Sequence, residues 1–134
     1  MNFSDFTGEV QHRLELGTEG EAVRATRAVL TTLGERIQAG EATDLAAPLP
    51  MEIDYYLESV DHGQGFGWDE FVSRVADRAE VEEGDATYYA QTVVALLTEV
   101  VPEGEVDDLR AALPDDYGDL FELAEADSTP WPEP

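Results

Sequence analysis

The chain has 134 residues, with 31 acidic and 7 basic side chains, and its formal net charge at pH 7 is −24. It contains no cysteine, which excludes disulfide bonds and thiolate metal sites. All the basic residues are arginines, and at about 1 M salt the Debye length is only roughly 3 Å, so exposed carboxylates hardly repel one another. This balance predicts a cytoplasmic protein of a salt-accumulating halophile, most plausibly an archaeon. The 43% hydrophobic content argues against disorder.

The first 40 residues predict two helices. Apolar residues at steps of three and four form a first helical stripe at Phe3, Phe6, Val10 and Leu14. Thr18 and Glu21 have the spacing of a capping box, so a second helix should begin after Thr18. Gly40 should end this second helix, since glycine is the usual residue just beyond a helix C-terminus.

A proline-rich corner follows. A short helix should carry Leu45 and Leu49, and Pro48 and Pro50 interrupt it because proline lacks the amide donor. Pro50 suits the first turn of another helix, which we expect over about residues 50–60.

The second half repeats this order. Its first stripe consists of Trp68, Phe71, Val75 and Ala79. The next helix, about Ala86–Val101, is apolar on all sides and should lie at the centre of the fold, with Pro102 ending it. The end of the chain, "DSTPWPEP", predicts an extended tail in which Trp131 either serves recognition or packs back onto the body.

Residues 22–50 align without a gap on residues 86–114, with eleven identities in 29 positions. We therefore predict an all-α fold of two tandem four-helix repeat units that share one core. The units should span residues 1–60 and 68–125, joined by a glycine-rich linker at 61–67 and followed by a flexible tail at 126–134. Leu49 and Leu113 occupy equivalent positions, one residue before the end of the two aligned segments, and should both be buried.

Three segments also carry a resemblance to a known family: "FTGEV", "AVRATRAVLTTLGERI" and "GEATDLAAPLP". In their succession the chain resembles, over about residues 3–125, the bacterial and archaeal family known as domain of unknown function 2267. The resemblance implies an all-helical, duplicated fold, and it supplies no catalytic residues. The family often has glutamine before the final "LP", where this chain has Pro48 and Ala112.

The histidines are the first candidates for chemistry. Glu9 and His12 have the E-x-x-H spacing of di-iron bundles, but such sites need a second motif, and the second half has Arg74 and Asp77 at the matching places. His62 follows Glu58 by four residues, and a histidine at a helix end needs no catalytic explanation. We therefore predict no catalytic, cofactor-binding or metal-binding residues.

Other site patterns are weak. The stretch "GQGFGW" looks like a phosphate loop, yet it lacks a preceding strand and a following lysine, so we interpret it as the linker. Arg24, Arg27 and Arg36 lie on one predicted helix but are separated by acidic groups, so nucleic-acid binding is not expected.

No segment approaches the length of a membrane span, and Met1 leads directly into an acidic amphipathic stretch without the pattern of a signal peptide. The sequence favours a small binding or regulatory module that acts on a protein partner or on itself. A carboxylate and histidine metal-dependent enzyme or metal-binding protein, and a nucleic-acid-associated regulator, are the alternatives.

Overall fold

The computed structural model describes residues 1–127, so Trp131 and most of the predicted tail lie outside the described residues. These residues form eight α-helices and one 3-10 helix and contain no strand, which confirms the all-α prediction. The elements are α1 (Phe3–Leu14), α2 (Glu19–Arg36), α3 (Ala39–Ala46), α4 (Ile53–Glu58), α5 (Trp68–Ala79), α6 (Glu83–Val100), α7 (Glu103–Ala112), η1 (Asp115–Phe121) and α8 (Glu122–Asp127).

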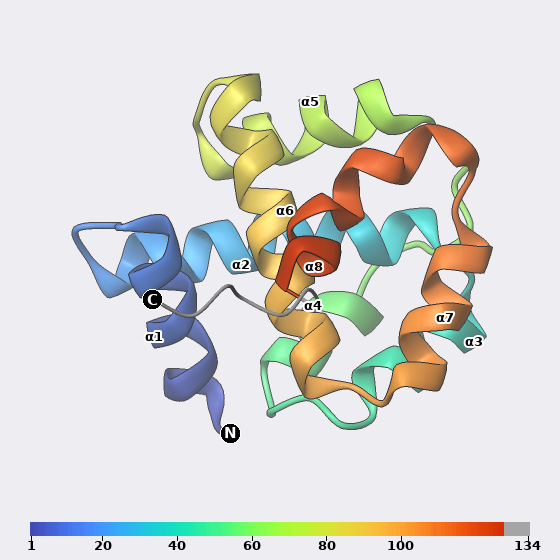
Figure 1. Ribbon diagram of the computed structural model, residues 1–134, viewed down its shortest axis with the longest axis horizontal. Coiled ribbons are helices and arrows are strands. Elements are labelled where there is room, and N and C mark those ends of the chain that lie inside the picture. The colour runs from blue at the N-terminus through green and yellow to red at the C-terminus, as the bar shows by residue number, and fades with distance from the viewer. Residues whose placement is uncertain (128–134) are drawn as a thin grey trace.

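Two long helices, α2 and α6, cross near the middle of the molecule, and the shorter helices surround them (Figure 1). Both α1 and α5 contact each of the long helices. The short helix α4 packs on α2, whereas η1 and α8 pack on α6. Their buried faces join in one hydrophobic core, so α6 takes the central position that its apolar sequence predicts.

The helix starts follow their capping residues. Thr18 Oγ1 accepts a hydrogen bond from the amide of Glu21 at 3.1 Å, which confirms the start of α2 after Thr18. The expected role of Gly40 is wrong. Helix α2 ends at Arg36, and Gly40 lies in the first turn of α3, because Gln38 and Glu41 form a capping box that begins this next helix.

The corner after Leu49 also differs from expectation. Helix α4 covers only Ile53–Glu58, shorter than the predicted 50–60. Glu52 has φ 79°, which no α-helix allows, so a turn separates Pro50 from the helix. Pro114, by contrast, directly precedes η1 and serves as its N-terminal flanking residue.

The two halves correspond in register. Helices α2 and α6 are both 18 residues long and start 64 residues apart, while α1 and α5 are both 12 long and start 65 apart. We call positions related by these shifts register-equivalent. Leu49 and Leu113, which are related by the 64-residue shift, are buried, with 7% and 8% of their surfaces exposed. The division into two tandem units stays a prediction, which superposition of the halves would test.

The segment 61–67 runs along the C-terminal end of α2. The amides of Gly63 and Gln64 donate to the carbonyls of Ile37 and Glu35, both at 2.8 Å. Gly34 makes the approach of α4 possible, because a Cβ at this position would collide with the carbonyl oxygen of Leu57. Backbone contacts thus hold the chain closely at this end of α2.

Four carboxylates meet where α3 lies against α7. Glu41 and Asp44 from α3 and Glu105 and Asp108 from α7 line a small cavity of about 20 Å³, with Leu45 and Leu109 among its apolar walls. This contact therefore brings like charges together, and its repulsion depends on screening by salt.

We predict that Leu113→Ala lowers the free energy of unfolding by about 2–5 kcal/mol, the usual range for truncating a buried leucine. Leu49→Ala should cost a similar amount. Tyr55→Ala, at a side chain that is 66% exposed, is the control and should change stability by less than about 0.5 kcal/mol. Denaturant unfolding at fixed KCl measures all three, and an unaffected Leu113→Ala variant would contradict the packing of this corner.

We predict that the helical circular-dichroism signal persists at molar KCl and decreases as KCl falls to tens of millimolar. Net stability is only about 5–15 kcal/mol, so many small repulsions can unfold the chain. Asp108→Asn should lower the KCl concentration needed for folding. Asp77→Asn, an exposed site on α5, should do so less. An unchanged melting temperature in 20 mM buffer would contradict the prediction.

Candidate functional site

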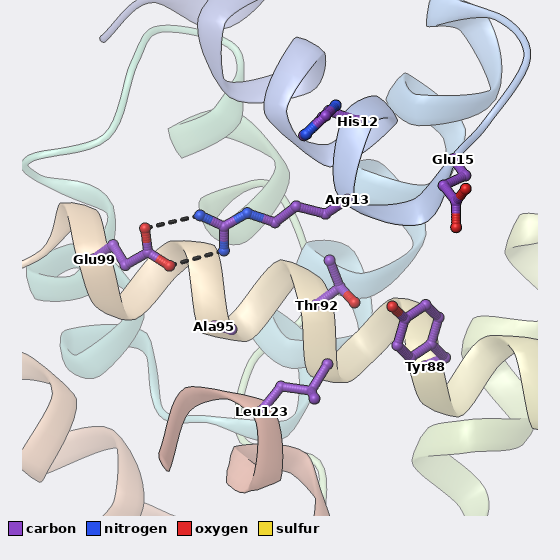
Figure 2. Close-up of a pocket in the computed structure, with 8 residues that line it drawn as sticks. All are labelled: His12, Arg13, Glu15, Tyr88, Thr92, Ala95, Glu99 and Leu123. Atoms are coloured by element: carbon purple, nitrogen blue, oxygen red, sulfur yellow. Dashed lines mark hydrogen bonds and ion pairs between the residues drawn. The ribbon is translucent and has the colours of Figure 1, made fainter. Parts of the chain in front are cut away.

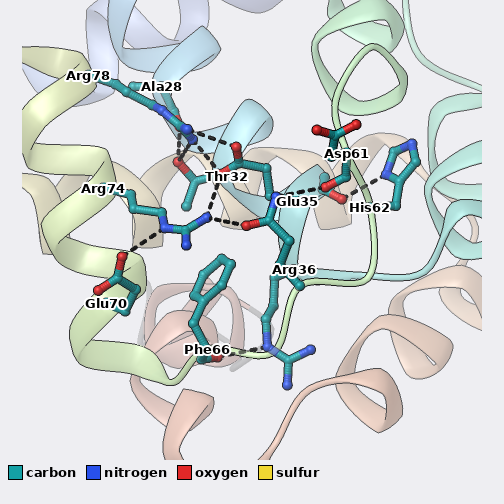
Figure 3. Close-up of polar contacts among 12 residues, drawn as sticks. Ala28, Thr32, Glu35, Arg36, Asp61, His62, Phe66, Glu70, Arg74 and Arg78 are labelled. Atoms are coloured by element: carbon teal, nitrogen blue, oxygen red, sulfur yellow. Dashed lines mark hydrogen bonds and ion pairs between the residues drawn. The ribbon is translucent and has the colours of Figure 1, made fainter.

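The most buried ion pair joins the two halves at Glu35 (Figure 3). Both terminal nitrogens of Arg78 donate to its carboxylate, at 2.7 and 2.8 Å, and Arg74 donates at 3.0 Å. The Glu35 side chain is only 13% exposed. Burial alone would raise the pKa of Glu35, but the hydrogen bonds from Arg78 and Arg74 outweigh it and lower that pKa below its ordinary value.

The same cluster holds the linker. The Arg74 guanidinium lies 3.9 Å from the centre of the Phe66 ring, a cation–π contact. The Phe66 carbonyl accepts hydrogen bonds from Arg36 Nε and from the Tyr117 hydroxyl, both at 2.8 Å. Burial raises the pKa of Tyr117 to about 12, so its hydroxyl stays a donor at neutral pH. These contacts fix the position of the linker relative to α2 and η1.

A second ion pair also joins the two halves, but here the first half supplies the arginine and the second half supplies the glutamate. Arg13 on α1 donates to Glu99 on α6 at 2.7 and 2.8 Å, and its Nε donates to Glu9 at 2.9 Å. Hydrogen bonding to Glu99 is the main cause that raises the pKa of Arg13, so its positive charge is secure. Arg13 and Arg78 are register-equivalent, as are Glu99 and Glu35. Yet Glu99 is 45% exposed, because space remains beside this pair.

That space is an open cleft of about 720 Å³ between α1, α6 and α8 (Figure 2). The Arg13–Glu99 pair lies at one end, and Glu15 and Tyr88 lie at the other. Its size falls within the roughly 300–1,000 Å³ that is typical of small-molecule sites. The lining combines charged, hydroxyl and apolar groups: His12, Arg13, Glu15, Tyr88, Thr92, Ala95, Glu99 and Leu123.

Thr92 stands out among these residues. It is one of four buried threonines in residues 1–127, and the other three donate to the carbonyl one turn earlier, at 2.8–3.1 Å. Thr92 Oγ1 has no hydrogen-bond partner although the side chain is 98% buried. A buried hydroxyl without a partner costs roughly 1–3 kcal/mol. Thr92 Oγ1 has less than 1 Å² of accessible surface, so other atoms of the protein separate it from the open space of the cleft.

The register-equivalent space between α2 and α5 is smaller, about 290 Å³, and is lined by Arg27, Ala28, Thr31 and Arg78. Ala28 is the register-equivalent of Thr92, so this position carries no hydroxyl that would need a partner. Arg24, the equivalent of Tyr88, forms an ion pair of 3.6 Å with Glu80, the equivalent of Glu15. The cleft at α1 and α6 is therefore larger and lacks this built-in cation.

The predicted E-x-x-H residues take part in different contacts. Glu9 binds Arg13, whereas His12 is exposed at the rim of the cleft. Within the described part of the chain, no group of three or more histidine or acidic side chains is placed to hold a metal ion.

The second histidine belongs to the linker. His62 Nδ1 lies 2.8 Å from the Gly34 carbonyl oxygen, and its Nε2 lies 3.2 Å from the backbone oxygen of Glu58. The backbone carbonyl oxygen of Asp61 accepts a hydrogen bond from Gln64 Nε2 at 2.9 Å. Glu58 and His62, the pair noted in the sequence, are thus in contact through the Glu58 backbone, and they hold the segment between α4 and α5.

The arginines of α2 do not form a basic stripe. Arg24 pairs with Glu80, and Arg36 binds the Phe66 carbonyl, while Arg27 is exposed at the smaller cleft. This arrangement gives no support to the nucleic-acid alternative, which needs clustered cations facing solvent.

Sequence reasoning missed Thr92, Tyr88 and Glu15. Comparison of the aligned repeats does contain a signal, because Thr92 replaces an alanine at a buried position and Tyr88 replaces an arginine. Neither change indicates a cleft until the packing of α1 and α8 on α6 is known. Leu123 lies outside the aligned residues 22–50 and 86–114, so this comparison could not indicate it.

The fold and the cleft together define a small all-α protein with a ligand-sized depression between its helices. The model of the family described as "Uncharacterized conserved protein (DUF2267)" matches residues 3–120, so the chain belongs to this family. The comparison with curated proteins gave no match. Among residues 1–127, no helix combines the length and the apolar character needed to cross a membrane.

We predict that Glu35→Gln lowers the free energy of unfolding by about 1–3 kcal/mol at neutral pH, because Arg74 and Arg78 lose a charged acceptor. Glu99→Gln is the matched control, and its half-exposed pair should cost less than about 1 kcal/mol.

The pH dependence follows from the lowered pKa of Glu35. Its contribution is full above the unfolded value, near 4.5, and is lost as pH falls through the lower folded value. The stability difference between the wild type and Glu35→Gln should therefore shrink in acid. Equal losses for both variants at pH 7 would contradict this account.

Proposed function

We propose that the protein is a non-catalytic binding module whose ligand occupies the cleft between α1, α6 and α8. The observation that carries this proposal is Thr92, a buried hydroxyl without a partner beside an open space of about 720 Å³. Natural proteins rarely leave a buried polar group unsatisfied, and such a group calls for an explanation. A ligand supplies one if its binding displaces the atoms that cover Thr92 Oγ1, which has less than 1 Å² of accessible surface, and if it then donates to or accepts from this hydroxyl.

The arrangement supports binding over catalysis. A threonine acts as a nucleophile only when an adjacent base takes its proton, and Thr92 Oγ1 has no hydrogen-bond partner. Arg13 and Glu99 are joined by two short hydrogen bonds, and Arg13 Nε also donates to Glu9. The cleft therefore offers shape, the hydroxyl groups of Thr92 and Tyr88, and a charged rim.

The setting that we propose is the salt-rich cytoplasm indicated by the net charge of −24. A ligand that binds only the folded state would stabilise that state, which links the folded fraction of the protein to the ligand concentration. We place a protein partner or a second copy at Met51, which precedes α4, and at Tyr55 on α4, whose exposed fractions are 82% and 66%.

We predict that Thr92→Val raises the free energy of unfolding by about 1 kcal/mol, because valine has the same shape without the stranded hydroxyl. Thr26→Val is the matched control and should show no gain, since Thr26 already donates to Ala22 at 2.8 Å. Saturation-transfer NMR with a mixture of small organic fragments should show binding to the wild type and weaker binding to Thr92→Val. A loss of stability in Thr92→Val, or the absence of any bound fragment, would contradict the proposal.

A further inference from the structure

We infer that the ligand of this cleft is a small organic cation, with an ammonium or guanidinium group on a short aliphatic stem. This inference rests on the proposed function of the cleft and adds the chemical class of its ligand. It depends on three observations: the charges around the cleft, the contacts at the register-equivalent place, and the surfaces available to the rest of the ligand.

The charges around the cleft favour a cation. The charged groups in and beside the cleft are one guanidinium, that of Arg13, and three carboxylates, those of Glu9, Glu15 and Glu99. Arg13 already directs its Nε to Glu9 and both terminal nitrogens to Glu99. An anion would therefore meet a net negative surface, whereas a cation would reduce the excess of negative charge.

The other half of the chain shows where such a cation would lie. There, Arg24 on α2 forms an ion pair with Glu80, which follows α5 in a left-handed conformation with φ 60°. Glu15 follows α1 in the same conformation, with φ 54°, but Tyr88 occupies the position equivalent to Arg24. A ligand cation beside Glu15 would take the place that the Arg24 guanidinium takes beside Glu80.

Tyr88 suits this role better than an aliphatic residue would. Its side chain is 47% exposed at the same end of the cleft as Glu15 (Figure 2), so the face of its ring is available to a cation. A cation–π contact and an exposed ion pair are each weak. The stem of the ligand must therefore add affinity by covering Ala95 and Leu123, the apolar part of the lining.

The hydroxyl of Thr92 lies one helical turn beyond Tyr88 on α6, between the cation position and the Arg13–Glu99 pair. Its oxygen has less than 1 Å² of accessible surface, so a polar group on the stem would contact it only after the atoms that cover it move. The register-equivalent Ala28 offers nothing comparable, which explains why we place the ligand in one cleft and not in both.

The experiment is a calorimetric titration at constant ionic strength, at the lowest KCl concentration that keeps the chain helical. The probes are n-butylguanidinium and n-butylammonium, with n-butanol as the neutral analogue and n-butyrate as the anionic one. Both cations should bind the wild type at least tenfold more tightly than butanol or butyrate.

Two variants test whether the cation binds between Glu15 and Tyr88. Glu15→Gln should weaken cation binding about threefold to tenfold, and Glu80→Gln, its register-equivalent control, should leave it unchanged. Tyr88→Arg supplies a guanidinium in the manner of Arg24 and should abolish binding of the cations. Glu15 and Tyr88 are both exposed, so all of these variants should fold, which their circular-dichroism spectra verify.

The outcomes separate the two proposals. If butanol or butyrate binds as tightly as the cations and Thr92→Val weakens it, the cleft is a binding site but the assignment of a cation is wrong. If cation binding persists in both Glu15→Gln and Tyr88→Arg, the cations bind elsewhere on the acidic surface, which also overturns the inference. If none of the four probes binds and the fragment mixture fails as well, both proposals are wrong.

Discussion

The carboxylate of Glu35 is the contact on which the placement of the second half of the chain depends. It receives Arg74 and Arg78 from α5 and is 13% exposed, so removing it would leave two cations without their shared acceptor. Through Arg74 it also positions Phe66, and the Phe66 carbonyl in turn holds Arg36 and Tyr117. The linker, α5 and η1 are therefore tied to the C-terminal end of α2 by one connected set of polar contacts.

The reciprocal pair between Arg13 and Glu99 has the same geometry but a different environment. Its carboxylate is 45% exposed, and α8 contributes Leu123 to a wall that has no equivalent beside Glu35. The same ion pair thus serves as a buried tie on one side of the molecule and as the rim of a cleft on the other. The duplicated pair acquires different roles because its surroundings differ, while the two short hydrogen bonds between its arginine and its glutamate remain alike.

The choice of arginine follows from these contacts. Six of the seven arginines take part in ion pairs, carbonyl contacts or ring contacts within the described chain: Arg13, Arg24, Arg36, Arg74, Arg78 and Arg110. Several of them use the forked or planar geometry of guanidinium, as when Arg110 binds Glu125 and also lies 4.4 Å from the Phe121 ring. Lysine offers neither geometry, and the many carboxylates without an arginine must depend on salt for their screening.

The sequence by itself determined the elements that local physics controls. Apolar spacing set α1, α2, α5 and α6, and Thr18 set the start of α2 through its hydrogen bond to Glu21. The burial of Leu49 and Leu113 also followed from the aligned repeats. The all-α class and the family required no more than these patterns.

Tertiary structure alone decided which surfaces meet. The two arginine partners of Glu35 are 39 and 43 residues away, and Glu99 is 86 residues from Arg13. No periodicity encodes such separations. Gly40 does not end a helix, because the capping box of Gln38 and Glu41 begins α3 just before it. Thr92 looks like any buried threonine in the sequence. Its missing partner and the cleft beside it arise only when α1, α6 and α8 pack together, because long-range packing determines which polar groups are satisfied and which remain available.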